Sequence, residues 1–538
     1  MIKKWGIYIT GFLLSFLYTG NSNAQQQKTS AASRLEILFA ERQSYKKVDS
    51  ATELQTFAGK VKLKHDKTLF FCDSVILNSK TNILEAFGSV HINDNDSIHT
   101  YADYLRYNTD SKIAKLKKNV RIKDTHGTNM QTQELDYDLN TKIATYVTGG
   151  KIVTKRTVLT SKAADYYQDV DEVIFRRDVE IIAPDYNIYT DSILYNTKTE
   201  KAQFIAPTTI VNKDKKTVYA NAGYYDLKTG KAILEKGATL QDGSSTVSSD
   251  IMAFDDETGI AQFKGNFVYT DTVEGISMLA GQAFSNNKTN SFLAFDKPLL
   301  IIKQENDSTF VKADTLFTAK LTDLAYYKSI PILTDTTKGY IAPDLLGKDS
   351  SQNRFFRAWY NVKIYSDSAQ AVCDSLFYAG TDSVFRMFKE PVIWGNNSQI
   401  LADTIYMFTK NRKPERLNAF YNAFMVNKSN ESLYNQVKGK TLNAWFVDGE
   451  ISYVRTKGNA ESVYYPVDDD EQYIGMNKSK ADAIDMFFTN RKPERVLFIK
   501  DLEGTIYPLS QIPTGLNELP GYKWLEHLRP KSKFEMLQ

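Results

Sequence analysis

Residues 101–124 read YADYLRYNTDSKIAKLKKNVRIKD. The rest of the chain repeats this unit with changes in sequence and in spacing. A short strand ends on Tyr107, a polar turn covers 108–112, and a longer strand follows. Along the longer strand, apolar residues alternate with charged ones. One face carries Ala114, Leu116, Val120 and Ile122. A period of two is typical of a half-buried β-strand.

The residue that closes the first strand recurs at steps of 28–33 residues. It recurs as Tyr45, Leu77, Tyr107, Tyr137, Tyr167, Tyr195, Tyr225, Phe254, Phe284 and Phe317, and looser copies follow near Tyr378, Met407, Trp445 and Met486. An Ala-Asp pair often precedes it, as at 102–103 and 402–403. This spacing predicts a repeat array in which stacked units share one continuous core.

The composition favours an all-β protein. The chain of 538 residues is 42% hydrophobic and contains 32 Tyr and 30 Phe but only 5 Trp. Tyr and Phe suit half-buried pleated surfaces. A net charge of +3 gives no reason to expect a nucleic acid as partner.

The start of the chain resembles a secretory signal peptide. Lys3 and Lys4 precede an apolar run at 7–18, and small residues at 22–24 could form a cleavage site. An uncleaved N-terminal anchor is the alternative. The predicted division of the chain is a signal peptide at 1–24, a mobile leader at 25–33, ten regular repeats at 34–320, an insertion or hinge at 321–356, a more divergent second part at 357–507 and a C-terminal tail at 508–538.

The sequence shows no catalytic or metal-binding motif, so we predict neither an enzyme nor a cofactor. His91 and His99 flank a turn and are expected to be solvated loop residues. Cys72 and Cys373 occupy the same slot of the repeat. Equivalent slots in distant units should lie far apart, which favours two free buried thiols over a disulfide.

Several stretches resemble the OstA/LptA-like (organic solvent tolerance protein-like) family, the β-jellyroll proteins of lipopolysaccharide transport. The chain is most similar to the long OstA-like proteins of Bacteroidetes-type bacteria, and the resemblance is best over 34–212. The stretches that carry it are LEILFAE at 35–41, FAGKVKL at 57–63, FCDS at 71–74, EAFGSVHI at 85–92 and YADYLRYN at 101–108.

The resemblance implies a V-shaped, open stack of antiparallel strands whose apolar groove holds the acyl chains of lipid A. The residues that would line this groove are Leu84, Ala86, Val90, Ile92, Leu116, Val120, Ile122, Phe204, Leu234, Phe263 and Phe267. Small inward residues such as Gly88, Ala114, Ala238 and Gly265 would leave room for a ligand. They could equally fit a narrow bend of the strands. In an open groove, a carboxylate at position 116 could reach water.

We therefore predict a periplasmic protein that binds lipopolysaccharide and carries it toward the outer membrane. Its expected partners are lipid A and other β-jellyroll proteins of the transport machinery, joined by strand-edge pairing, with self-assembly as a further option. A structural β-solenoid or cell-surface adhesin without a groove is the alternative, and a β-helical carbohydrate-active enzyme is a more remote one.

Overall fold

Each repeat of the sequence forms two antiparallel strands that cross the molecule side by side. The computed structural model describes residues 35–538 except 97, 126, 128, 155–156, 304–307, 324–353, 411–412, 469, 471 and 491. The predicted signal peptide and leader lie outside the described residues, as does most of the predicted insertion. The described residues form 38 strands in one hydrogen-bonded array. The predicted all-β, repetitive jellyroll is therefore confirmed.

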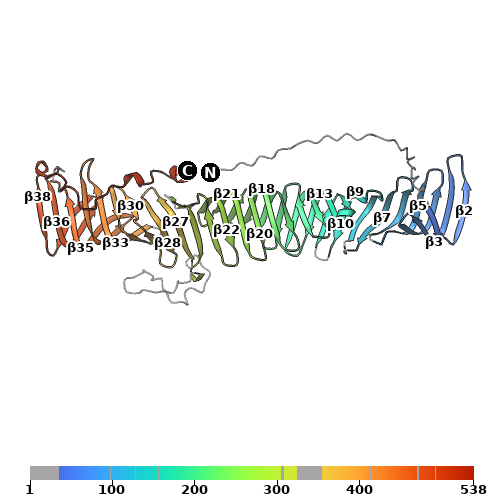
Figure 1. Ribbon diagram of the computed structural model, residues 1–538, viewed down its shortest axis with the longest axis horizontal. Helices are drawn as coiled ribbons and strands as arrows, with labels where there is room; N and C mark the ends of the chain where they lie inside the picture. Colours follow the sequence, from blue (N-terminus) through green and yellow to red (C-terminus); the bar gives the residue numbers. More distant parts are fainter. Residues whose placement is uncertain are drawn as a thin grey trace, which may run out of the picture.

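The strands follow one another along a single elongated stack (Figure 1). Up to residue 320 they are β1 (Leu35–Phe39), β2 (Arg42–Lys47), β3 (Glu53–His65), β4 (Thr68–Asn78), β5 (Ile83–Asp94), β6 (Ile98–Asn108), β7 (Ile113–Asp124), β8 (Asn129–Asp138), β9 (Ile143–Tyr146), β10 (Gly150–Val153), β11 (Val158–Ser161), β12 (Ala163–Tyr167), β13 (Glu172–Ile182), β14 (Tyr186–Asn196), β15 (Lys201–Phe204), β16 (Thr208–Asn212), β17 (Thr217–Asp226), β18 (Lys231–Asp242), β19 (Ser245–Ser249), β20 (Ile251–Asp255), β21 (Ile260–Asp271), β22 (Ile276–Asn286), β23 (Ser291–Phe295), β24 (Leu299–Lys303), β25 (Ser308–Lys312) and β26 (Thr315–Lys320).

The stack continues beyond the predicted insertion, because β26 and β25 both pair with β27. The later strands are β27 (Arg354–Tyr365), β28 (Ala369–Ala379), β29 (Val384–Phe388), β30 (Val392–Gly395), β31 (Ser398–Leu401), β32 (Thr404–Lys410), β33 (Lys413–Lys428), β34 (Tyr434–Val447), β35 (Glu450–Tyr464), β36 (Met476–Thr489), β37 (Lys492–Ile499) and β38 (Glu503–Tyr507). Short helical turns are η1 (Gln168–Val170), η2 (Leu321–Asp323), η6 (Leu509–Gln511), η7 (Glu526–Leu528) and α1 (Lys533–Leu537).

A sharp corner divides each long strand into two halves that belong to two facing sheets. In β7 the corner residues Lys118 and Asn119 have φ of 66° and 51°, and the pairing register shifts there. We call the layer that contains 104–108 and 113–117 sheet 1, and the layer that contains 90–94 and 120–124 sheet 2. Gly88 is the corner residue of β5, where a Cβ would lie 2.2 Å from the Asp73 carboxylate.

The corner explains the Ala-Asp signal of the sequence. Ala102 is buried between the sheets, and Asp103 points outward. The Asp103 carboxylate accepts a hydrogen bond of 2.7 Å from the Asn119 amide, which holds the left-handed corner of the next strand. The same pairing recurs between Asp403 and Asn422 at 3.0 Å. The Ala-Asp pairs therefore mark where the chain passes from one sheet to the other.

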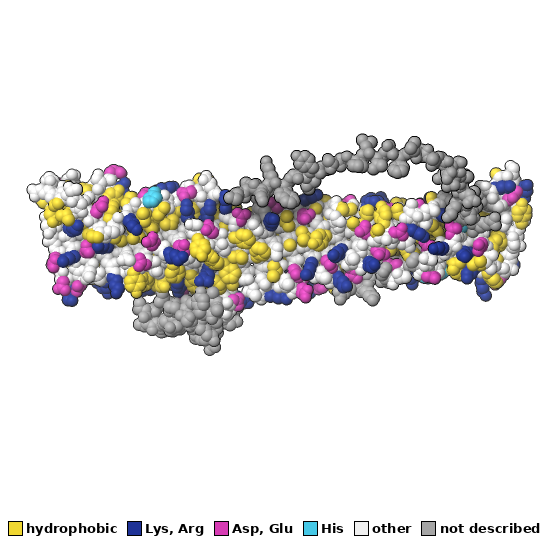
Figure 2. All heavy atoms as spheres, in the orientation of Figure 1, with side chains coloured by type: hydrophobic (Ala, Val, Ile, Leu, Met, Phe, Trp, Pro, Cys, Tyr) yellow, Lys and Arg dark blue, Asp and Glu magenta, His cyan; other side chains and the backbone are white. Residues whose placement is uncertain are grey.

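Apolar side chains fill the space between the sheets. One cluster of buried residues extends without interruption from Phe57 to Phe488. Tyr107 and Tyr137 lie inside it, as the repeat predicts. The repeat assignment is one residue out at Tyr167, Phe284 and Phe317, which lie on the outer face; the Phe284 ring stacks there on Phe295 at 5.8 Å. On the face of the molecule seen in Figure 2, charged side chains of both signs are interspersed with apolar ones.

The C-terminal residues 508–538, which we call the C-terminal strap, run back over the outer face of sheet 2 (Figure 1). The strap follows β38 and ends with α1, which contacts β25 and β27. Beneath it, Phe424 and Val426 of β33 are buried against Leu519, while Ala423 and Met425 face the interior. Both faces of this strand half are therefore buried. This explains why the sequence loses its alternation there.

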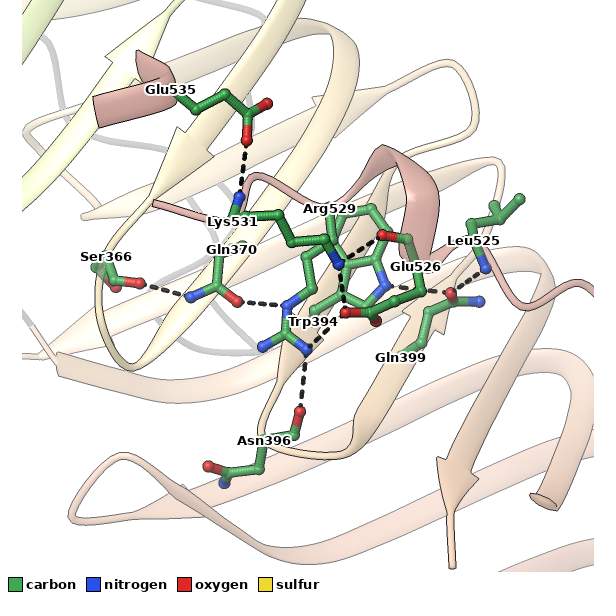
Figure 3. A network of polar contacts seen from close by, with 10 residues as sticks. All are labelled: Ser366, Gln370, Trp394, Asn396, Gln399, Leu525, Glu526, Arg529, Lys531 and Glu535. Atoms are coloured by element: carbon green, nitrogen blue, oxygen red, sulfur yellow. Dashed lines mark hydrogen bonds and ion pairs between the residues drawn. The ribbon is translucent and has the colours of Figure 1, made fainter. Parts of the chain in front are cut away.

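Buried glutamines hold the strap in place. The Gln399 side chain donates to the Lys523 carbonyl at 2.8 Å and accepts from the Leu525 amide at 2.8 Å. One amide thus satisfies two backbone groups of the strap, as a neighbouring β-strand would. Farther along, the Arg529 guanidinium donates to the Gln370 side chain at 2.7 Å (Figure 3).

A substitution of Gln436 tests this docking. Its side chain donates to the Asn517 carbonyl at 2.9 Å and accepts from the Leu519 amide at 2.9 Å. Gln436→Ala leaves both backbone groups unpaired. We therefore expect the local stability of the docked strap to fall by about 1–3 kcal/mol, and amide exchange at 517–519 to become faster. The exposed Gln203→Ala is the control. Unchanged exchange in Gln436→Ala would mean that the amide does not hold the strap.

Candidate functional site: the mouth between the two sheets

Two rows of turns face each other on the side of the molecule opposite the corners. The turns at 79–82, 109–112 and 139–142 end strands of sheet 1, and those at 66–67 and 95–96 end strands of sheet 2. Between the rows lies a pocket of about 570 Å³ that residues of both rows line. We call this opening the mouth. It leads to the interior that the apolar residues fill.

Polar side chains cross the mouth and join the two sheets. His65 Nδ1 lies 2.6 Å from the Tyr107 hydroxyl. In the adjoining turns, Lys112 Nζ donates to the Asp66 carboxylate at 2.5 Å. Each pair joins a residue of sheet 2 to one of sheet 1. These contacts therefore connect the sheets where backbone hydrogen bonds do not.

Asp94 is the most connected of the residues that cross the mouth. Its carboxylate accepts hydrogen bonds from the Tyr137 hydroxyl at 3.0 Å and from the Thr68 hydroxyl at 2.9 Å, and it forms an ion pair with Lys142. The Asp94 side chain is only 6% exposed. A carboxylate this buried requires such partners, because its desolvation is otherwise costly.

The tyrosines of the mouth are neutral hydrogen-bonding groups. Burial raises the pKa of Tyr107, and the carboxylates of Asp66 and Asp94 raise it further. Burial and Asp94 do the same to the pKa of Tyr137. Both phenols keep their protons across the physiological range, so each can donate a hydrogen bond across the mouth.

The cross-mouth contacts repeat with the period of the sequence. Lys112 and Lys142 are 30 residues apart, as are Tyr107 and Tyr137, whereas Asp66 and Asp94 are 28 apart. Sequence reasoning found the tyrosines but missed their polar partners. The common 28–30-residue step of acids and lysines at turns could have revealed them. We call this set the mouth latch: His65, Asp66, Asp94, Tyr107, Lys112, Tyr137 and Lys142.

The structure places all of the predicted groove residues in the apolar interior, seven of them in the strands behind the mouth and four farther along the stack. Each belongs to the continuous apolar cluster, with an exposed fraction between 1% and 6%. They are Leu84, Ala86, Val90, Ile92, Leu116, Val120, Ile122, Phe204, Leu234, Phe263 and Phe267. In this state they pack against one another, so a ligand between the sheets requires the sheets to separate. Gly88 and Gly265 lie at corners and do not line the interior.

The other polar residues singled out in the sequence lie away from the mouth. His91 and His99 are in strands on the outer face and not in loops, which corrects the prediction of solvated loop residues. His91 Nε2 lies 3.0 Å from His99 Nδ1, and the His91 ring stacks on Tyr101 at 4.5 Å. Burial, together with His99, lowers the pKa of His91.

The two cysteines are buried free thiols, as predicted. Burial raises the pKa of both Cys72 and Cys373 to about 12. Neither thiol is therefore a ready nucleophile. Within the part of the chain that the structure describes, no group of three or more histidine, cysteine or acidic side chains could hold a metal ion.

Residues 33–191 match the family model described as OstA-like protein. This segment belongs to the OstA-like family. It contains the whole mouth latch, together with seven of the eleven predicted groove residues. With the long antiparallel jellyroll, the match indicates a β-jellyroll protein of the lipopolysaccharide-transport type. No curated protein matches the chain. Among the described residues, no helix has the length and apolar character needed to cross a membrane.

Proposed function

We propose that this protein carries lipopolysaccharide in the periplasm toward the outer membrane, with the acyl chains of lipid A between its two sheets. The observation that carries the proposal is the unbroken apolar interior of the jellyroll, from Phe57 to Phe488, together with the match of its residues 33–191 to the OstA-like family model. Acyl chains would replace side-chain contacts there by contacts of the same apolar kind. The signal peptide predicted at 1–24 would supply the route to the periplasm.

A structural stack without a ligand is the second candidate. The near-complete burial of the predicted groove residues favours it, because a filled interior is stable without lipid. The two functions differ in whether lipid is bound to the protein when it is purified from the cell.

Mass spectrometry of lipid extracted from the purified protein separates these two functions. The protein should be prepared from a lipopolysaccharide-producing host without detergent, and part of it unfolded in urea and refolded as a lipid-free control. A carrier yields lipid A-containing species in near-stoichiometric amount before urea treatment only. Equal traces in both samples would favour the structural stack.

The ends of the stack are suited to pairing with other jellyroll proteins or with a second copy. At the first end, β1 pairs with β3 on one side and exposes Ile37 and Phe39 by 44% and 50%. At the other end, Leu502 and Ile506 are exposed by 55% and 70%. Apolar edge strands of this kind are ready templates for another strand.

Replacement of Ile37 by proline tests the edge-pairing proposal. Proline removes a backbone N–H and fixes φ, so Ile37→Pro should abolish end-to-end assembly while the interior stays folded. Ile37→Thr keeps the backbone donor and serves as the control. Light scattering gives the assembly state and thermal melting the fold. Assembly by Ile37→Pro at the wild-type concentration would refute pairing through β1.

A further inference from the structure

The closed interior raises the question of where the two sheets separate. Backbone hydrogen bonds run between neighbouring strands within each sheet, and at the corners the chain itself joins the sheets. Opening at the corners would therefore bend or break strands. At the mouth the sheets meet only through side chains in the described structure, so separation there leaves every backbone ladder intact.

The contacts across the mouth of the OstA-like segment are of a kind that water can replace. Lys112 and Asp66 are 28% and 46% exposed, and Lys142 is 29% exposed. Water can solvate these ends as they part, because they already border solvent. The residues behind them are apolar, and they are stabilised by contact with other apolar groups, whether these are side chains or acyl chains.

The second half of the stack is built differently at the equivalent place. There, Asn427 donates to the Ser398 hydroxyl at 3.0 Å, and Asn435 donates to Asn427 at 3.4 Å. These residues belong to neighbouring strands of sheet 2, so this ladder runs along one sheet. The C-terminal strap also covers the outer face of that sheet.

We propose that the mouth latch is a gate, and that acyl chains enter the interior by opening the mouth of the OstA-like segment. This inference rests on the proposed function and adds the place and the means of entrance. The acidic and basic groups of the latch close the mouth when the interior is empty. When the sheets part, these groups form hydrogen bonds with water instead of with one another. The second half stays closed during this step.

Cysteines placed on the mouth side of the corners report on such an opening. Ile92 of β5 and Met425 of β33 both face the interior beyond the corner of their strand, the first in the OstA-like segment and the second in the second half. Both are buried, so a maleimide should label Ile92→Cys and Met425→Cys slowly, and the native Cys72 and Cys373 lie beside the corners, away from the mouth. Opening of the mouth should expose position 92 and leave position 425 covered. The ratio of the two labelling rates thus separates opening of the gate from unfolding of the whole chain.

The latch is weakened by the double substitution Asp94→Asn with Tyr107→Phe, which preserves side-chain shape. We expect labelling at position 92 to rise roughly tenfold or more, with labelling at position 425 unchanged, since local opening governs access to buried groups. Asp103→Asn weakens a corner contact instead and should change neither rate. An equal rise at both positions, or no rise at position 92, would overturn the gate.

A reversible lock tests entrance directly. Cysteines introduced by Asp66→Cys and Lys112→Cys lie in facing turns and can be joined with a reducible bismaleimide. We expect the locked protein to lose uptake of purified lipopolysaccharide, measured by co-elution, and to regain it after reduction. If the unlocked protein takes up no lipopolysaccharide, the proposed function fails. If locked and unlocked proteins load equally, the gate alone fails.

Discussion

A protein that ends at Tyr507 should lose the fold of the second half of its stack. Without the C-terminal strap, Phe424, Val426 and Met476 become exposed on the outer face of sheet 2. Each such side chain contributes roughly 1.5–3 kcal/mol when fully buried, so the expected loss is about 5–9 kcal/mol. Gln399 and Gln436 would also lose their partners. This loss is comparable to the whole stability of a typical domain.

The loss should be confined to the second half, because stacked units contact only their neighbours. Thermal melting of the truncated protein should show an early transition, and limited proteolysis should first cut beyond residue 354. A synthetic peptide of residues 508–538 should restore the resistant form. A truncated protein that melts as one unit at the wild-type temperature would show that the strap adds no stability.

Leu116→Asp should destabilise the OstA-like segment by several kcal/mol. Leu116 is 1% exposed between the sheets, and a carboxylate there has neither water nor a partner. An open groove would have tolerated the change, but the structure closes the interior behind the mouth latch. The control is Arg121→Asp, which places the same group on the outer face of β7.

Equilibrium unfolding in urea measures both variants. We expect a lower midpoint for Leu116→Asp and little change for Arg121→Asp, since exposed substitutions are usually nearly neutral. If Leu116→Asp unfolds at the wild-type midpoint, the interior is accessible to water in solution. The closed state would then not be the resting one.

The period-two strands and the 30-residue step were enough to predict the all-β jellyroll. The alternation around Leu116 predicted the buried face correctly, because each side chain of β7 faces either the interior or the solvent. The Ala-Asp pairs were visible as a repeat, but their role at the corner was not. It depends on a hydrogen bond such as that from Asn119 to Asp103, which joins neighbouring strands.

The mouth latch and the strap could not be read from local pattern. Asp94 and Lys142 are 48 residues apart and meet only because the corners fold one half of each strand over the other. Gln436 and Leu519 are 83 residues apart and meet only because the tail turns back along the stack. Where the strap covers sheet 2, as at Phe424, burial of both faces removes the alternation that marks a strand.

Photo-crosslinking from within the interior tests the central claim most directly. Phe204 of β15 faces the interior, and its neighbour Gln203 faces solvent. Benzoylphenylalanine at each position, in separate variants, reports on what touches that face in the presence of purified lipopolysaccharide. A carrier gives a lipopolysaccharide adduct from position 204 and none from position 203. No adduct from 204, or equal adducts from both, would contradict lipid between the sheets.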